Sequence, residues 1–282
     1  MNMLDAMDKR TSVRTYLDEM PGSSLMESVE KIVTKQRKGP FGNRFSFTLI
    51  SVNDETREEI GKLSSYGMIK NAPLYFGGYA ENEEHAIIDY GYCFEEAVLE
   101  LAAIGLGTCW LGGTFSRGKV ARLLTLPEGK IIPAISPIGF SGEKMSLTEK
   151  ISRFVAGSKN RKPHNKILFS WNTDGQLMPE DLEKYPAPVD EVIESVRFAP
   201  SASNKQPWRI VRQGDLHHLY CDLDKNYARL FRHFKIQLLD MGIALCHFLK
   251  ASEELRWRGK FSYADPHLEN SDWIYILSWK KV

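Results

Sequence analysis

Three residues near the N-terminus, Arg10, Ser12 and Arg14, occupy alternate positions in the stretch RTSVR. Successive side chains of an extended chain point to opposite sides, so an extended backbone would aim all three to one side. Two guanidinium groups and a hydroxyl can surround a phosphate with charge-assisted hydrogen bonds of about 1.5 to 3 kcal/mol each, before desolvation is counted. The spacing therefore indicates an anion site, although a solvated basic helix end has the same residue types.

A second cationic pair, Lys159 and Arg161, alternates in the same way in SKNRKP. Pro163 disfavours a helix at the residue before it, which keeps this segment near an extended conformation. By itself the pair also fits a charged linker.

Two uncharged segments could complete a ligand site. The loop APSASNKQPW contains Pro200 and Pro207, which exclude a helix, and it offers polar side chains with free backbone N–H groups, so it can either wrap a flat polar ligand or simply join a helix to a strand. In CWLGG an apolar run enters Gly112 and Gly113, which permit close approach of the backbone to a ligand or form a plain turn.

Taken together, RTSVR, PSASNKQPW, GLGTCWLGG and the late Lys-x-Arg-x-Pro resemble the nitroreductase family, whose members bind FMN between two subunits. The resemblance covers most of the first 170 residues and the stretch from about 189 to 212, and PSxxNxQPW is its most specific motif. It implies that the cationic segments hold the ribityl phosphate and the pyrimidine edge of the flavin, and that the N–H of Gly113 lies near flavin N5. The FMN-binding residues that it implies are Arg10, Ser12, Arg14, Leu111, Gly112, Gly113, Lys159, Arg161, Pro200, Ser201, Ser203 and Asn204.

The order of the motifs departs from the common family pattern. Most members place the PSxxNxQPW loop some tens of residues after the first arginine motif, but here that position holds the degenerate stretch Pro40 to Phe45. Conversely, the second half lacks a convincing Arg-x-Ser-x-Arg and a glycine pair after its long helix. The simplest interpretation is a fused pseudo-dimer of residues 1–166 and 167–282 that retains one FMN site per chain and works as a monomer.

An internal repeat leads to the fold class. Each half is expected to contain a helix, a loop, two strands, a long helix and two further strands, with Asn43 matching Asn204 and the Asp-x-Gly at Asp89 matching that at Asp240. The sequence predicts an α+β, nitroreductase-like fold with the long helices paired at the centre. The predicted helices span 24–35, about 85–104, 189–198 and about 227–255, the strands lie near 47–52, 73–80, 107–113, 130–140, 208–213, 217–223, 258–264 and 272–280, and 158–188 is predicted to link the halves.

Composition excludes several classes of protein. The 37 Lys and Arg residues nearly balance the 36 Asp and Glu residues, so no global field favours nucleic acid or an anionic membrane. No apolar run approaches the roughly 20 residues of a membrane helix, and the N-terminus lacks a secretory core, so we expect a cytoplasmic protein without a membrane partner. The four cysteines lack CxxC spacing, which indicates reduced core thiols, and adjacent His217 and His218 cannot chelate together from a strand, so no metal site is predicted.

The resemblance implies FMN chemistry in which NADH or NADPH reduces the flavin at N5 and a flat electron-poor acceptor, such as a nitroaromatic or a quinone, is then reduced. Arg14 is expected near the flavin pyrimidine, and no acid or base residue of the protein is required. The alternatives are another flavin enzyme on this fold and a non-catalytic flavin-binding or sensory protein. The acceptor and the nucleotide stay open, because the residues expected to line the acceptor lie in variable segments, at Phe41, Tyr66, Phe231 and Phe234.

Overall fold

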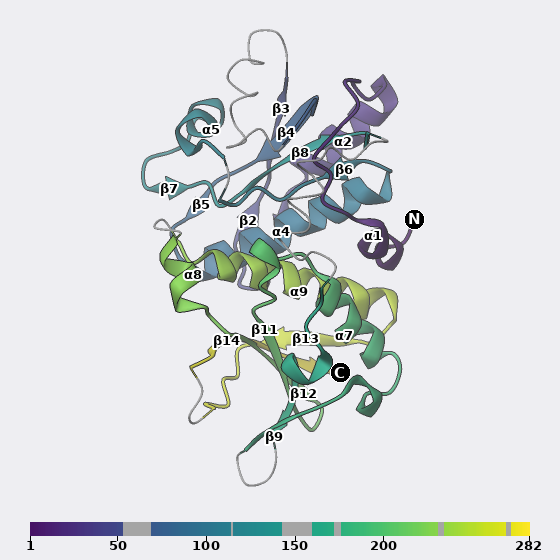
Figure 1. Ribbon diagram of the computed structural model, residues 1–282, viewed down its shortest axis with the longest axis vertical. Helices are drawn as coiled ribbons and strands as arrows, with labels where there is room; N and C mark the ends of the chain where they lie inside the picture. The colour runs from purple at the N-terminus through teal and green to yellow at the C-terminus, as the bar shows by residue number, and fades with distance from the viewer. Residues whose placement is uncertain (53–68, 114, 143–159, 172–175, 231–233, 269–271) are drawn as a thin grey trace.

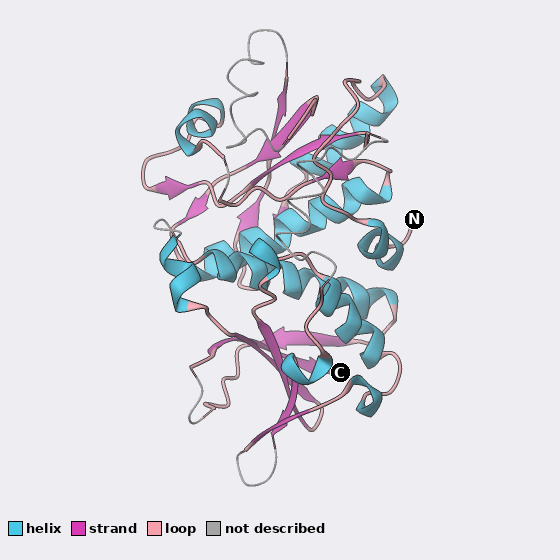
Figure 2. Ribbon diagram, viewed as in Figure 1, coloured by secondary structure: helices cyan, strands magenta, loops and turns pink. Residues whose placement is uncertain are grey.

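Two sheets lie on the outside of the molecule and two long helices lie between them (Figure 1). This computed structural model describes residues 1–52, 69–113, 115–142, 160–171, 176–230, 234–268 and 272–282. Figure 2 separates the layers clearly, with strands above and below the central helices. The predicted α+β arrangement with central long helices is confirmed.

The first sheet has four antiparallel strands in the order β3-β4-β8-β6. Short pairs β1-β2 and β5-β7 lie outside it. The elements of this part are α1 (Met3–Lys9), α2 (Ser23–Thr34), β1 (Arg37–Lys38), β2 (Arg44–Phe45), β3 (Thr48–Ser51), β4 (Leu74–Gly77), β5 (Ala80–Glu81), α4 (Glu84–Ala103), β6 (Gly107–Thr108), α5 (Arg117–Leu123), β7 (Lys130–Ile131) and β8 (Ile135–Gly139).

Among the described residues, the second sheet has six strands in the order β10-β9-β11-β12-β14-β13, in which the β9-β11 pair is parallel and the other pairs are antiparallel. Helix α7 packs beside α9. The elements are η2 (His164–Lys166), β9 (Leu168–Trp171), β10 (Leu177–Pro179), η3 (Leu182–Lys184), α7 (Val189–Phe198), η4 (Ala202–Asn204), β11 (Trp208–Gln213), β12 (Leu216–Cys221), α8 (Lys225–Leu230), α9 (Ile236–Glu254), β13 (Gly259–Ser262) and β14 (Ile274–Lys281).

Two sequence predictions about the second half are wrong. The segment 158–188 is more than a linker, because it contains β9 and β10, which are two of the six strands of the second sheet. The helix predicted from Tyr227 to Leu255 is two helices: Asp224 accepts hydrogen bonds from the N–H groups of Asn226 and Tyr227 and so caps the start of α8, and α9 begins only after Lys235, whose ψ of 94° is not helical. The apolar pattern of the sequence indicates neither the two strands nor the break between the helices.

The long helices α4 and α9 cross at two glycines. A Cβ atom on Gly242 would lie 2.0 Å from the carbonyl oxygen of Ile88, and one on Gly91 would lie 2.3 Å from that of Leu239. Only the missing side chains allow the backbones to approach this closely. The two Asp-x-Gly sequences of the repeat therefore meet at the seam between the halves.

Apolar side chains surround both long helices, as their sequence predicts. Buried residues lie on all sides of α4 and on nearly all of α9, because each helix packs against its partner and against a sheet. Gly105, with φ of 87°, follows the end of α4 and confirms that the glycines after this helix terminate it. All four cysteines are buried and none forms a disulfide bond, which agrees with the predicted core thiols. Within the described residues, no helix is both long enough and apolar enough to cross a membrane.

Candidate functional site

The N-terminal cationic segment is extended, as the alternation of its residues predicts. Ser12 forms a parallel bridge with Thr108 of β6, and the N–H of Val13 donates to the Thr108 carbonyl over 2.9 Å. Val13 is buried, while Ser12 and Arg14 are partly exposed on the other side of the chain. The segment thus lies beside the strand that leads into the Trp-Leu-Gly-Gly sequence.

Both arginines of this segment have spare hydrogen-bonding capacity. Arg10 Nε and Arg14 NH1 are buried, and neither has a hydrogen-bond partner among the described residues. A buried donor without a partner costs free energy, so such atoms suit a site that receives an anionic ligand.

Arg161 connects the second cationic segment to the PSASNKQPW loop. Its guanidinium donates to the carbonyl oxygens of Phe198 and Ala199 over 2.8 and 3.1 Å, and to Asn204 Oδ1 over 2.8 Å. Burial, followed by the positive charges of Arg10 and Arg197, lowers the pKa of Arg161 to about 10. Arg10 and Arg161 are therefore near enough to repel each other, and a bound anion would relieve that repulsion.

The loop itself is held by polar contacts within and around it. Ser201 Oγ accepts from the N–H of Gln206 over 2.9 Å, and the hydroxyls of Ser203 and Tyr227 lie 2.9 Å apart. Gln206 Nε2 donates to the Asn160 carbonyl and Gln206 Oε1 accepts from the Lys162 N–H, so this side chain ties the loop to the cationic segment. Ser203, Asn204 and Gln206 have φ values of 49°, 52° and 48°, in the left-handed region that residues other than glycine seldom adopt.

A buried pair that the sequence analysis missed lies behind the arginines. Glu95 of α4 and His247 of α9 are fully buried, and Glu95 Oε1 lies 3.0 Å from His247 Nε2 and 3.9 Å from Arg10 Nε. His247 Nδ1 lies 3.0 Å from the Ser195 carbonyl, so both ring nitrogens face acceptors.

Glu95 also reaches the glycine segment. Its Oε2 accepts from the indole Nε1 of Trp110 over 2.6 Å. One carboxylate thus joins Trp110, which precedes Leu111 and Gly112, to Arg10 and to the second half through His247. The signal in the sequence was a glutamate and a histidine within the largely apolar middle of two long helices.

The glycine segment has a defined conformation. Leu111 is buried and bridges Ile135, and the carbonyl of Gly112 accepts from Arg117 over 2.6 Å. A Cβ atom on Gly112 would lie 3.0 Å from Ile236 at the start of α9. Gly113 is exposed. Because the Gly112 carbonyl and the Gly113 N–H belong to one trans peptide, they point in opposite directions, and the N–H faces away from Arg117.

The degenerate loop of the first half has different contacts. Asp89 accepts from the N–H of Phe41 through Oδ1, and from both the N–H and the side-chain amide of Asn43 through Oδ2, all over 2.9 Å. Gly39 packs directly against the Asp89 side chain. Asn43 is thereby held inside its own half, and Phe41 stacks on His85 at 4.0 Å between ring centroids.

The structure brings Arg10, Arg161 and the Asn204 loop together, with the Trp110 to Gly113 segment joined to Arg10 through Glu95. Lys159 lies outside the described residues, as do Tyr66 and Phe231 of the predicted acceptor-lining set. Phe234 is buried, and the Arg117 guanidinium carbon lies 5.9 Å from the centroid of its ring.

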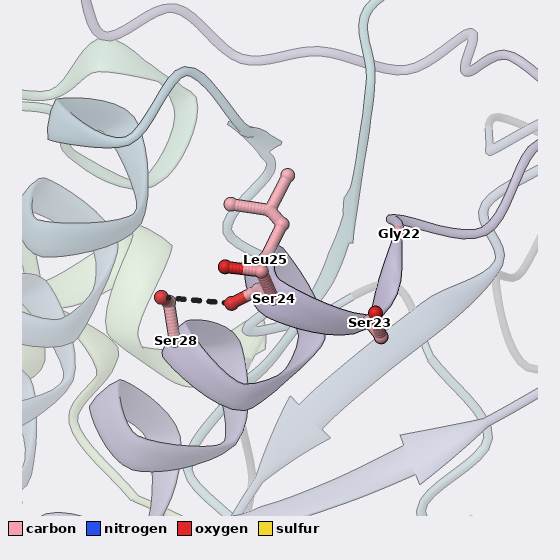
Figure 3. A pocket seen from close by; sticks show the side chains of 5 residues that line it. All are labelled: Gly22, Ser23, Ser24, Leu25 and Ser28. Atoms are coloured by element: carbon pink, nitrogen blue, oxygen red, sulfur yellow. Dashed lines mark hydrogen bonds between the residues drawn. The ribbon is translucent and has the colours of Figure 1, made fainter.

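A surface hollow lies elsewhere, at the start of α2 (Figure 3). Its lining comes from one short stretch of chain: Gly22, Ser23, Ser24, Leu25 and Ser28. Ser28 Oγ donates to the Ser24 carbonyl, which is an ordinary contact within a helix. No residue of the candidate site lines this hollow, and it adds nothing to the assignment.

Most of the chain matches a known protein family. A family model described as "Putative TM nitroreductase" matches residues 2–252. A protein of Methanothermobacter thermautotrophicus described as "Putative NADH dehydrogenase/NAD(P)H nitroreductase" is 28% identical over 155 residues, which are 51% of this chain and 79% of that protein.

Two solved structures are also similar. A "putative nitroreductase" from Thermotoga maritima is 20% identical, covers 100% of this chain and 94% of its own, and has a TM-score of 0.62, which shows a shared fold. A nitroreductase from Bacteroides fragilis with bound FMN is 19% identical, covers 52% of this chain and 92% of its own, and has a TM-score of 0.40.

Proposed function

Because this chain belongs to the family described as "Putative TM nitroreductase", we propose that it is an FMN-dependent NAD(P)H oxidoreductase that reduces a flat electron-poor acceptor such as a nitroaromatic or a quinone. The observation that carries the proposal is the convergence of Arg10 and Arg161 beside the Asn204 loop, with spare donors on Arg10 and Arg14. FMN carries a phosphate that suits these cations and a flat ring that suits the loop.

The site contains the kinds of hydrogen-bond donor that FMN needs. Arg10, Arg14 and Arg161 supply guanidinium groups for the phosphate and the electron-rich pyrimidine edge, and Ser12 supplies a hydroxyl. The Gly113 N–H faces away from the Arg117 contact, and we propose that it donates to flavin N5. Bound FMN would accept a hydride at N5 from NADH or NADPH and pass the electrons to the acceptor.

The protein contributes charge, orientation and exclusion of water. Arg14 would stabilise negative charge that develops on the flavin pyrimidine, since a preorganised cation needs little rearrangement during the reaction. Glu95, which is fully buried, holds Trp110 by a hydrogen bond and places a carboxylate 3.9 Å from Arg10 Nε. Lys159, Pro200, Ser201 and Ser203 complete the proposed binding set with Leu111, Gly112 and Asn204.

We propose one FMN per chain. The Asn43 amide is held by Asp89 in the first half, whereas Asn204 contacts the cationic segment in the second half. This asymmetry supports a fused pseudo-dimer, with parts 1–166 and 167–282, that works as a monomer. A cytoplasmic location is part of the proposal, and four reduced thiols suit it.

The test is an anaerobic absorbance titration with FMN, followed by NADH and then NADPH. We expect a bound flavin band that saturates at one FMN per chain and bleaches with at least one nucleotide, after which an acceptor screen is justified. Bound flavin that bleaches with neither nucleotide would favour a non-catalytic flavin-binding protein. Failure to bind FMN would remove the proposal altogether.

A matched pair of variants tests the location of the site. Arg10→Ala removes a guanidinium from the proposed phosphate site and should weaken FMN binding at least about tenfold, because one charge-assisted hydrogen bond is worth about 1.5 to 3 kcal/mol. Arg258→Ala removes an exposed arginine and should leave the affinity unchanged. Equal affinities for the two variants would place FMN elsewhere.

A further inference from the structure

The two halves contain the same aspartate-to-loop contact, and in one half it is incomplete. Phe41 and Ala202 are equivalent in the repeat, and the N–H of each donates to Oδ1 of the aspartate of its own half over 2.9 Å. In the first half Oδ2 of Asp89 then receives the N–H and the side-chain amide of Asn43. In the second half Oδ2 of Asp240 is buried and has no partner among the described residues.

The missing donors belong to Asn204, the equivalent of Asn43. Asn204 is held on the other side of the loop, where its Oδ1 accepts from Arg161 over 2.8 Å and its Nδ2 donates to the Asn160 carbonyl over 2.8 Å. Its N–H donates to the Ser201 carbonyl over 3.0 Å. The two equivalent asparagines therefore have different hydrogen-bond partners. Asn43 bonds to the aspartate of its half, and Asn204 bonds to the cationic segment.

The loop that carries Asn204 is held in an unfavourable backbone conformation. Ser203 has φ of 49° at the position where the first half has Gly42 with φ of 102°, and Asn204 itself has φ of 52°. Residues other than glycine disfavour this left-handed backbone conformation, so contacts around the loop must maintain it. Arg161 is one of those contacts, and it is also a proposed ligand of the flavin phosphate.

We propose that Asp240 is a positioning residue for Asn204: an anion bound at Arg161 releases Asn204, whose N–H and amide groups then donate to Asp240 Oδ2, as those of Asn43 donate to Asp89. This inference rests on the proposed FMN site. It extends that proposal by making formation of the loop contact a consequence of phosphate binding. Asn204 acts on the flavin side of the loop, and Asp240 acts through Asn204.

The exchange moves a proton. Oδ2 can receive two N–H donors only when it is ionised, so a protonated Asp240 must lose its proton to solvent when Asn204 arrives. Burial raises the pKa of Asp240 to about 7, and the hydrogen bond from the Ala202 N–H offsets part of that increase. The titratable groups that face it are Tyr227 of α8 and Cys221 of β12, and burial raises the pKa of both, so they stay neutral between pH 6 and 8. Its neighbours on α9, from Ile236 to Ala244, carry no other charge.

The experiment compares FMN affinity in the wild-type protein and in Asp240→Asn by calorimetry at pH 6, 7 and 8. Asparagine keeps an oxygen for the Ala202 N–H but presents an amide group that cannot accept from Asn204. The wild-type protein should bind FMN about as tightly as the variant at pH 6 and up to about tenfold more tightly at pH 8, following the ionised fraction of Asp240. Titration of the FMN phosphate is common to both proteins and cancels in the ratio.

Asn204→Ala supplies a second measurement with Asp240 intact. Its FMN affinity relative to wild type should show the same pH dependence, because it removes the side-chain amide donor in place of the acceptor. Asp89→Asn, in the other half, should leave the pH dependence of wild type unchanged. A wild-type-to-Asp240→Asn affinity ratio that is the same at pH 6 and 8 would overturn the inference while leaving FMN binding intact. Absence of FMN binding by the wild-type protein at every pH would overturn the proposed function and this inference with it.

A structure of the FMN complex gives a readout independent of activity. We expect Asn204 Nδ2 within hydrogen-bond distance of Asp240 Oδ2, with Arg161 contacting the phosphate. Asn204 still held by Arg161 while FMN is bound would contradict the exchange.

Discussion

Asp240 should make the folded chain less stable as the pH rises from acid to neutral. It is fully buried, and its pKa of about 7 compares with 3.8 for an ordinary aspartate. At 1.36 kcal/mol per pKa unit, this difference corresponds to about 4 kcal/mol. Because the folded state binds the proton more tightly than the unfolded state, the proton stabilises the fold, and that stabilisation is lost between about pH 4 and pH 7.

The perturbation is Asp240→Asn, which is neutral at every pH. Relative to wild type, the free energy of unfolding of the variant should increase by about 3 kcal/mol between pH 4.5 and pH 7.5, and most of the change should occur below pH 7. Urea denaturation of both proteins at each pH measures it, and other titrating groups cancel in the difference. A difference that stays constant across this range would refute the reasoning, because Asp240 would then ionise alike in the folded and unfolded states.

Asp89→Asn is the matched control in the other half. Both oxygens of Asp89 accept hydrogen bonds, three in all, so an amide group at this position must face an N–H donor of Asn43 or Phe41. The variant should be less stable than wild type at pH 7.5, by about 1 to 3 kcal/mol for the unmet donor. A loss of stability in Asp89→Asn at pH 7.5 together with a gain in Asp240→Asn would establish that the hydrogen-bond partners of the two aspartates, and not their position in the repeat, decide the effect.

Three further outcomes are expected. Arg14→Ala should weaken FMN binding and slow reduction of the bound flavin by NAD(P)H, as measured by stopped-flow absorbance, and unchanged values for both would remove Arg14 from the flavin site. Glu95→Leu should lower the free energy of unfolding in urea by about 3 kcal/mol or more, because it leaves both the buried His247 and Trp110 without their hydrogen-bond partner, whereas Glu95→Gln can still bond both neighbours and should cost less; equal losses would refute this account. Gly242→Ala should lower the melting temperature by several degrees, because its Cβ would lie 2.0 Å from a carbonyl of α4, while Gly118→Ala has open space and should be neutral or stabilising; equal effects would contradict the close helix contact.

Much of the fold was accessible from the sequence because it depends on local patterns. Apolar residues around the whole of 85–104 predict a helix packed on several sides, and the glycines after it predict its end, both as observed. The break between α8 and α9 was not predicted, since it depends on the Asp224 cap and on the conformation of Lys235, neither of which interrupts the apolar pattern. Strand β9 lies in the segment that the sequence predicts to be a linker, because its pairing with β11 is a contact between distant segments.

The sequence by itself determined which residue types could form the site: alternating cations, a proline-bounded polar loop and a glycine pair. It also predicted the repeat, because matched residues can be read without coordinates. Tertiary structure decided how matched residues differ. Asn43 bonds to Asp89 while Asn204 bonds to Arg161, and Glu95 pairs with His247 across 152 residues of chain. Spacing along one segment specifies the side to which its side chains point, but their partners come from other segments, and only packing of the two halves brings those within hydrogen-bond distance.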